Sequence, residues 1–422
     1  MLPRWLILIC FCIFLQWNVD SSSAKKLDVV HEWKYFDYDF GSEKKRDEAI
    51  KSGEYNYKSM APIDVDKWKD LTFVTVIRAK GVPASLNIVT DKLGPGGPLL
   101  KPYPDWSWAK LGNCDSITSV YRVAIDKCDR LWVLDNGKVD DNPICDPQLL
   151  AFDLNTSKLL KRIKIPEKIA VNATTGKGLL VTPVVDTRGE YCQNTIVYVA
   201  DVDGYALIYY DDRRHFFKRL TSSAFNYDPK YTKFTIEGES FTLQDGIVGM
   251  ALSQQTGNLY FTPMSSHTIG FVQTNILKRS MGESLKVTTY DNILYTQESA
   301  KAMSKSGILF SGRVSDTSIG CWYERKPRTK EYVGTVAKDP VTLQFTSGMK
   351  VKQGSCEELY VLTNRHQKIV GGTLNYNEPN FRILKGSVKK LVQGTVCEPY
   401  REIPVFPPIW PWLFGPGPRV PF

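Results

Sequence analysis

Short apolar runs separated by polar turns dominate this chain, and helical periodicity is rare. The clearest block contains four apolar runs, at residues 120–125, 130–135, 148–153 and 159–165. Asp, Asn, Gly and Lys residues fill the gaps between these runs, as expected of tight turns. Four antiparallel strands within about 50 residues are typical of one blade of a β-propeller.

The same theme returns along the chain at a loose period of roughly 40 to 60 residues, within the range of repeat folds. Apolar runs open the successive units near the following positions: Leu71, Val120, Thr195, Asp245, Lys301 and Thr342. We therefore predict an all-β fold, a six-bladed β-propeller with four-stranded antiparallel blades. A β-sandwich with several hairpins is the alternative, but the units are too many for one sandwich. In a propeller, loops converge at a mouth of the central channel, and this mouth is the expected ligand site.

The first 24 residues predict a secretory signal peptide. Arg4 precedes an apolar run at residues 5–17, and small and polar residues follow up to Ala24, near which we expect cleavage. The apolar run is too short to span a bilayer comfortably, although a short membrane anchor is the alternative. No later run predicts a transmembrane segment. The mature protein is therefore expected to be secreted and extracellular.

Three further regions are expected in the mature chain. Residues 25–66 form an N-terminal segment, in which residues 29–38 supply a strand that closes the ring and the charged residues 41–51 form a solvated turn of helix. Residues 67–400 form the propeller. Residues 401–422 form a Pro- and aromatic-rich tail that cannot join a sheet interior. This tail is either a docking peptide for a partner or an extension without function.

Cysteines and sequons fit an extracellular compartment. Of nine cysteines, Cys10 and Cys12 leave with the signal peptide, and an odd number, seven, remains. Most of these should form disulfides outside the cell, with at least one left over. The spacings fix no connectivity, and no C-x-x-C motif indicates a zinc site. Two sequons, at Asn155 and Asn172, predict glycosylation, with chance matches to a short motif as the alternative.

Charge and motifs exclude some function classes. The net charge of +9 is spread along the sequence without a basic stripe, so we expect no nucleic-acid partner. No G-x-S-x-G, H-E-x-x-H or P-loop motif occurs, no catalytic residue identifies itself, and no cofactor is predicted. The histidines lack metal-ligand spacing; they are His31, His215, His267 and His366.

A calcium ion at the channel is the one metal site that we considered. Its candidate oxygen ligands lie near predicted strand ends: Asp135, Asp201, Asp245 and Asn364. Because Asp at a strand end is usually a turn residue, we predict no metal site.

Long strings of residues resemble the major royal jelly protein/Yellow family of insects, and its royal jelly branch most. The strings begin at the following residues: His31 (HEWKYFDYDFGS), Gly81 (GVPASLN), Gly96 (GGPLLKPYPDW), Cys128 (CDRLWVLD), Gln244 (QDGIVGMAL), Ile319 (IGCW) and Leu374 (LNYNEPNFR). The resemblance covers roughly residues 28 to 397, and the tail and the region of Cys356 lie outside the pattern.

The resemblance implies a secreted, often glycosylated, six-bladed propeller with three disulfides. It pairs Cys114 with Cys145, Cys128 with Cys192 and Cys321 with Cys397, which leaves Cys356 unpaired. It also implies a homo-oligomer or a small partner peptide.

Three functions follow from the resemblance. The first, which we favour, is a nutritive, storage or signalling role without catalysis. The second is a carrier of a small ligand, a biogenic amine or a sterol, at the propeller mouth. The third is a dopachrome-converting enzyme in pigmentation.

The resemblance also indicates candidate ligand contacts. Amine-binding relatives use an Asn-Arg-Phe stretch, which corresponds here to Asn364, Arg365 and His366. The change of the aromatic residue to His366 weakens the amine prediction, and Asn364 is alternatively a turn residue. The candidate ligand contacts are therefore Asn364, His366 and Asp245.

Overall fold

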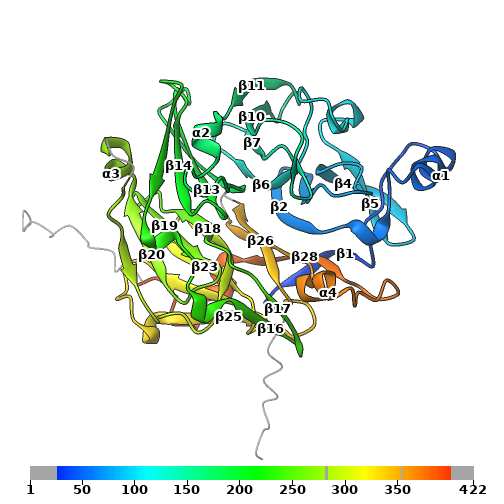
Figure 1. The fold of residues 1–422 in the computed structure, drawn as a ribbon. Helices are drawn as coiled ribbons and strands as arrows, with labels where there is room; N and C mark the ends of the chain where they lie inside the picture. The colour runs from blue at the N-terminus through cyan, green and yellow to red at the C-terminus, as the bar shows by residue number, and fades with distance from the viewer. Residues whose placement is uncertain (1–25, 281–283, 353, 355, 401–422) are drawn as a thin grey trace, which may run out of the picture.

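Six four-stranded antiparallel sheets form the body of the molecule, in a computed structural model that describes residues 26–280, 284–352, 354 and 356–400. The sheets are arranged as blades around a central channel, and the chain passes from blade to blade around the ring (Figure 1). This architecture confirms the predicted six-bladed β-propeller. The predicted signal peptide, residues 1–24, and the predicted tail, residues 401–422, lie outside the described residues.

Each blade begins with an inner strand at the channel and ends with an outer strand at the rim. The first three blades contain these strands: β2 (Pro62–Trp68), β3 (Leu71–Val76), β4 (Leu86–Gly94) and β5 (Gly97–Pro102); β6 (Val120–Ile125), β7 (Arg130–Asp135), β10 (Gln148–Asp153) and β11 (Leu159–Lys164); β12 (Leu180–Arg188), β13 (Asn194–Asp201), β14 (Ala206–Asp211) and β15 (Phe216–Thr221). The last three contain β18 (Ile247–Leu252), β19 (Asn258–Pro263), β20 (Ile269–Gln273) and β21 (Thr288–Tyr290); β22 (Glu298–Met303), β23 (Ile308–Arg313), β24 (Ser318–Tyr323) and β25 (Val333–Lys338); β26 (Thr346–Lys352), β27 (Glu358–Thr363), β28 (Phe381–Ser387) and β1 (Asp28–Trp33).

The N-terminal strand β1 completes the last blade. It pairs antiparallel with β28, and Trp33 lies opposite Phe381 in the register. The sixth blade is thus built from both ends of the described chain, with β1 (blue) beside β28 (orange) in Figure 1. Trp33 is buried and donates a hydrogen bond from its indole nitrogen to the carbonyl oxygen of Pro98, at 2.6 Å, so β1 is also attached to the first blade.

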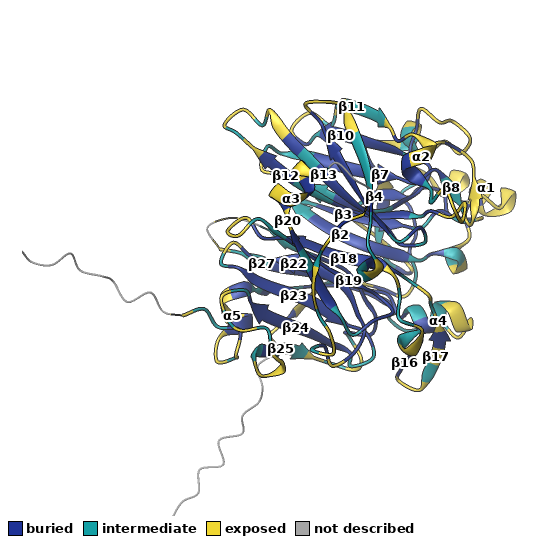
Figure 2. Cartoon of the chain, turned by 60° about the vertical axis from the view of Figure 1, so that its left-hand side comes forward, coloured by how far each residue is buried: buried dark blue, intermediate teal, exposed yellow. Residues whose placement is uncertain are grey.

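The hydrophobic core lies between the blades rather than at the channel. Six clusters of buried side chains occur among the described residues, one between each pair of neighbouring blades. Alternating apolar residues on both faces of each sheet supply these layers, as expected where sheets pack face to face. Figure 2 shows the strands as buried and the loops at the rims as exposed.

The turns between inner and second strands follow a recurring side-chain pattern. In the second blade, Asp126 accepts hydrogen bonds from the backbone N–H groups of Cys128 and Arg130, and Asp129 takes a left-handed conformation with φ 54°. In the fourth blade, Ser253 accepts from the N–H groups of Gln255 and Thr256. Asp and Ser close these turns because their short side chains can bond to the backbone two residues further along.

Few helices accompany the strands. The described α-helices are α1 (Glu43–Ser52), α2 (Glu167–Ala170), α3 (Thr274–Arg279), α4 (His366–Gly371) and α5 (Val388–Val392), and short 3-10 helices occur at 57–59, 106–109, 223–225, 229–231 and 330–332. Helix α1 begins after the N-cap Ser42 and ends at Gly53, whose φ of 79° suits glycine. None of the described helices is long and apolar enough to cross a membrane.

Two small hairpins stand apart from the blades. One joins β8 (Lys138–Val139) to β9 (Asn142–Pro143), and the other joins β16 (Lys233–Ile236) to β17 (Glu239–Thr242). The second hairpin lies in the connection between the third and fourth blades and reaches α4 of the sixth blade (Figures 1 and 2). Glu239 accepts a hydrogen bond from Lys368, at 2.8 Å, at this contact.

Three disulfides occur among the described residues: Cys114–Cys145, Cys128–Cys192 and Cys321–Cys397. These are the pairs that the family resemblance implies. Cys356 is a free and exposed cysteine. Cys128–Cys192 joins the second blade to the third, whereas Cys321–Cys397 fastens the segment after α5 to the fifth blade.

Two inner strands differ from the sequence-based assignment. The first blade begins at Pro62 with β2, so it includes residues 62–66, which we had placed in the N-terminal segment. The third blade begins with β12, for which the sequence predicted no strand. Both strands carry polar residues or proline within the apolar run, because one side of an inner strand faces the channel rather than a packed sheet.

Candidate functional site

The central channel is the candidate functional site, and all six inner strands line it. It encloses a cavity of about 160 Å³. Most of the lining is small or apolar, with Val, Ala, Gly and Met side chains from several blades. Four charged side chains also line the cavity: Asp64, Arg122, Lys301 and Lys350.

A bulge near the start of every inner strand shapes this lining. In each of the six pairings with the second strand, the register shifts within the first four residues. In β6, the shift lies between Val120 and Val123, and it contains Tyr121 and Arg122. An extra residue in one strand re-aims the side chains around it, and bulges are common beside functional sites. The bulge in β6 therefore accompanies the placement of Arg122 in the channel lining.

Two of the channel cations are neutralised by buried carboxylates. Lys350 lies 2.7 Å from Asp64, which is fully buried and also accepts a hydrogen bond from the N–H of Val123. Lys301 pairs with Glu298, to which Ser311 donates a further hydrogen bond at 2.7 Å. Burial alone would raise the pKa of Glu298, but the nearby cations outweigh it and keep this pKa below its ordinary value.

Arg122 is the channel cation without an ion pair among the described residues. Its guanidinium donates to the carbonyl oxygen of Ser347, at 2.9 Å, and its Nε has no partner. Burial lowers the pKa of Arg122, while the carboxylates of Asp64 and Asp245 oppose this effect. The interior of the channel therefore carries one buried positive charge that polar neighbours solvate only in part.

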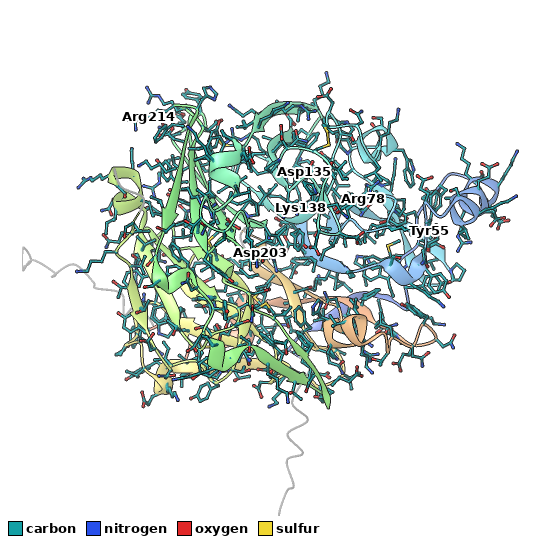
Figure 3. The ribbon with its side chains drawn as sticks, viewed as in Figure 1. Tyr55, Arg78, Asp135, Lys138, Asp203 and Arg214 are labelled. Carbon is teal, nitrogen blue, oxygen red and sulfur yellow. A yellow bond between two sulfur atoms is a disulfide. The ribbon has the colours of Figure 1, made fainter. Side chains whose placement is uncertain are left out.

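We call the opening at which the inner strands begin the N-terminal mouth, and acidic residues gather there. Asp203 follows β13, Asp245 precedes β18, and Asp141 lies between β8 and β9. Burial is the largest cause of the raised pKa of Tyr121, and these three carboxylates all raise it further. Figure 3 shows Asp203 and Lys138 near the centre of the ring.

Asp203 and Asp245 are partly buried and lack partners. Among the described residues, neither carboxylate accepts a hydrogen bond or forms an ion pair. Burial raises the pKa of Asp245 to about 7; the charge of Asp203 adds to the rise, and Arg122 opposes it. Burial also raises the pKa of Asp203, and Asp201 adds to that rise. The charges of Arg122 and Lys138 act on these two carboxyl groups, but no direct ion pair within the described chain occupies either of them, so the pair is suited to a cationic ligand.

The predicted ligand contacts Asn364 and His366 lie on the same side of the propeller but contact other groups. Asn364 is fully buried and donates to the carbonyl oxygen of Pro62, at 2.7 Å, so it joins the sixth blade to the first. His366 begins α4 and lies between the rings of Phe241 and Phe345. Within the described part of the chain, no hydrogen bond, ion pair or ring contact joins either residue to Asp245.

The remaining calcium candidates accept hydrogen bonds from backbone N–H groups of their own blades. Asp135 accepts from the N–H groups of Thr118, Ser119 and Gly137, and Asp201 accepts from those of Leu179 and Gly204. Asp201 also pairs with Arg219, at 2.7 Å. No group of three potential His, Cys, Asp or Glu ligands occurs among the residues that the structure describes. Bonds within the blade, both to the local turn and to the segment before the inner strand, account for both carboxylates.

Our reading of the sequence missed Arg122, Asp64 and Asp203. Arg122 gave a visible signal, because it interrupts the apolar run VYRVAI at residues 120–125. Asp64 gave none, since the strand that carries it was not predicted. Asp203 lies in an ordinary turn sequence, Asp201 to Gly204, and only the ring brings it close to Asp245.

The comparisons with known proteins agree with the resemblance in the sequence. Residues 118–397 match the family model described as "Major royal jelly protein". Major royal jelly protein 9 of Apis mellifera is 51% identical over 409 residues, which cover 93% of this chain and 96% of the relative. Major royal jelly protein 1 of Apis mellifera is 46% identical over 417 residues, which cover 94% of this chain and 96% of the relative.

Similarity to solved structures is much more distant. A luciferin-regenerating enzyme covers 80% of this chain, and this chain covers 92% of that enzyme, at a TM-score of 0.45 and 10% identity. That likeness is too low to bear on function, whereas the family match and the near full-length relatives do bear on it. The chain belongs to the major royal jelly protein family.

Proposed function

We propose that this protein is a secreted royal jelly-type glycoprotein with a nutritive, storage or signalling role and without catalytic activity. The observation that carries the proposal is the identity of 51% to a major royal jelly protein over nearly the full length of both chains. The predicted signal peptide and three disulfides support secretion, because disulfides persist in oxidising compartments.

The sequons also support the proposal. Asn155 is exposed in the turn between β10 and β11, where its side-chain oxygen accepts a hydrogen bond from Lys69 and its amide nitrogen is left for a glycan. Asn172 is partly buried and donates to the carbonyl oxygen of Gly204, at 3.3 Å. We expect glycans at both positions, as in a secreted glycoprotein.

The state of the channel carboxylates supports a role without catalysis. An isomerase acting on dopachrome needs a general acid and a general base at the reacting atoms. Asp64 and Glu298, the carboxylates in and behind the cavity lining, are held in ion pairs with Lys350 and Lys301. Glu298 is a poor proton acceptor when fixed in this way, because the nearby cations keep its pKa low.

A dopachrome assay on the purified protein tests this proposal. We expect dopachrome absorbance to fall no faster with the protein than in buffer. A faster loss that disappears in the channel variant Arg122→Gln would favour the enzyme instead. Gln at this position keeps part of the hydrogen bonding, so we expect the variant to fold. Circular dichroism checks that it does.

One observation favours a second function, the carrier of a biogenic amine. The unpaired carboxyl groups of Asp203 and Asp245 at the N-terminal mouth are suited to a primary ammonium group, and Tyr121 lies beside them. Nothing comparable favours a sterol, since the channel cavity of about 160 Å³ is small and charged.

Calorimetry with dopamine, and with uncharged catechol as the matched ligand, tests the carrier. If the carrier function is correct, dopamine binds and catechol does not. The substitution Asp245→Asn then lowers the affinity for dopamine by about tenfold. Dopamine affinity should also rise with pH through about 7, because Asp245 ionises there. This function would be excluded if both ligands bound equally. It would also be excluded if Asp245→Asn changed the affinity for dopamine no more than the exposed control Asp47→Asn does.

A further inference from the structure

The opposite opening of the channel, where the inner strands end, holds a larger cavity that the proposed function does not use. We call it the C-terminal mouth, and its cavity measures about 630 Å³. Every blade contributes to its wall through a polar side chain near the end of its inner strand. These side chains are Lys67, Lys127, Thr187, Gln254, Lys305 and Lys352.

Five lysines line this cavity, and none forms an ion pair among the described residues; they are Lys67, Lys69, Lys127, Lys305 and Lys352. Three of the ammonium groups donate only to neutral oxygens. Lys67 bonds to the carbonyl oxygen of Asp70, Lys127 to that of Gly189, and Lys69 to the side chain of Asn155. Within the described chain, the ammonium groups of Lys305 and Lys352 donate no hydrogen bond.

Two carboxylates in the same wall are already hydrogen-bonded, and an ion pair neutralises one of them. Asp126 pairs with Arg130, at 2.6 Å, and also accepts from the indole of Trp132. Asp129 accepts from the indole of Trp68, at 2.7 Å.

Asp66, the third carboxyl group in this wall, is buried and accepts a hydrogen bond from the N–H of Lys67. Burial raises its pKa to about 7, so it carries only part of its charge near neutrality. The cavity is therefore positive in charge.

The crowding of like charge affects Lys67 directly. Burial lowers the pKa of this lysine, and the positive charges of Lys352 and Lys385 lower it further. The face of Trp68 lies beneath the ammonium group of Lys69, at 4.0 Å from the ring centroid. The wall thus offers several ammonium donors and one flat apolar surface around a space large enough for a small molecule.

We propose that the C-terminal mouth binds a small polyvalent oxyanion, one that carries several phosphate or carboxylate groups. Clustered oxyanions match this site because lysine ammonium groups bind phosphate and carboxylate as point charges on flexible stems. Several groups on one ligand are required, because the lysines come from four different blades around the channel. The two mouths then have opposite preferences: cations at the carboxyl groups of the N-terminal mouth, and anions at the lysines of the C-terminal mouth.

Calorimetry of the full-length mature protein with tripolyphosphate and with citrate tests this proposal. The two probes separate phosphate from carboxylate as the preferred group. We expect at least one probe to bind with a stoichiometry of one, and its affinity to fall as sodium chloride is raised from about 50 to about 300 mM. In the double variant Lys305→Gln/Lys352→Gln, that affinity should fall by about tenfold or more.

The control removes the same charge elsewhere. Lys44 and Lys45 are exposed on α1, and the double variant Lys44→Gln/Lys45→Gln should bind the probe as the parent does. Thermal unfolding of both variants checks that they fold. Absence of binding by both probes, or an equal loss of affinity in the two variants, would overturn the proposal, because the second result indicates attraction to net charge alone.

Discussion

His366 shows how a single buried side chain links stability to pH. It lies between Phe241, at 5.3 Å between ring centroids, and Phe345, at 4.5 Å, and its Nδ1 has no partner. Burial lowers its pKa to about 4. In the unfolded chain the imidazole has its ordinary pKa of 6.5 and takes up a proton at higher pH. The neutral histidine therefore stabilises the fold fully above pH 6.5 and loses this contribution as the pH falls toward 4.

We predict that His366→Leu flattens the fall of the free energy of unfolding between pH 6.5 and 4. The contribution removed is at most about 3 kcal/mol, from about 1.4 kcal/mol per pKa unit. Denaturant unfolding at a series of pH values measures it, with the exposed His215→Asn as the control. An unchanged pH slope in His366→Leu would show that other groups cause the acid sensitivity.

Inner strands form the element in which this propeller departs most from a regular sheet. All six are bulged near their first residues, and they approach one another closely around the channel. Gly249 in β18 shows how close: a Cβ atom there would lie 2.0 Å from the carbonyl oxygen of Ser299 in β22. Because that neighbour is backbone, it cannot move aside as a flexible side chain would.

We therefore predict that Gly249→Ala destabilises the protein by about 2 kcal/mol or more, as expected of overpacking in a rigid core. Thermal unfolding monitored by circular dichroism checks this. The matched control is Gly112→Ala, because no atom lies within 4 Å of the Cβ position of Gly112. Its φ of 80° costs conformational strain alone, so equal losses in the two variants would contradict the steric explanation.

The same strands mark the limit of prediction from sequence. Second strands such as β7 and β13 read as unbroken apolar runs, since both of their faces are packed between blades. The inner strand β12 contains Pro183 and Asp186, and β2 contains Asp64 and Asp66, so neither resembles a buried strand. The residues that line the channel therefore lie in the elements that apolar periodicity detects least well.

The whole molecule depends on closure of the ring, and β1 provides it. Trp33 is 1% exposed, packs against Phe36 at 4.8 Å between ring centroids, and contacts the first blade through Pro98. In addition, Arg382 of β28 pairs with Glu32 of β1, at 2.8 Å. Both the first and the sixth blade would lose contacts if β1 were detached.

We expect Trp33→Ala to lower the free energy of unfolding by about 3 to 5 kcal/mol, the range for loss of a large buried aromatic side chain. The variant should unfold in one transition, identical by tryptophan fluorescence and by circular dichroism, because the ring unfolds as a unit. Val29→Ala serves as the control, since Val29 is exposed on the same strand. Two separate transitions in Trp33→Ala would indicate that only the sixth blade frays.

Closure of the ring also explains why the two mouths were only partly predictable. The lysines of the C-terminal mouth are far apart in sequence, from Lys67 to Lys352, and the sequence shows no basic stripe. The count of blades and the family were within reach, because each rests on local patterns or long strings of residues. Charge at the mouths arises from residues of several blades that are far apart in sequence, and only the folded ring brings them together.

The most direct test of the proposed function is intact-mass spectrometry of the protein isolated from its native secretion, under native and then denaturing conditions. We predict an abundant mature chain that begins near residue 25 and carries glycan mass at Asn155 and Asn172, with mass consistent with three disulfides and one free thiol. Absence of the protein from the secretion, or a chain that retains residues 1–24 and carries no glycan, would contradict a secreted royal jelly-type role.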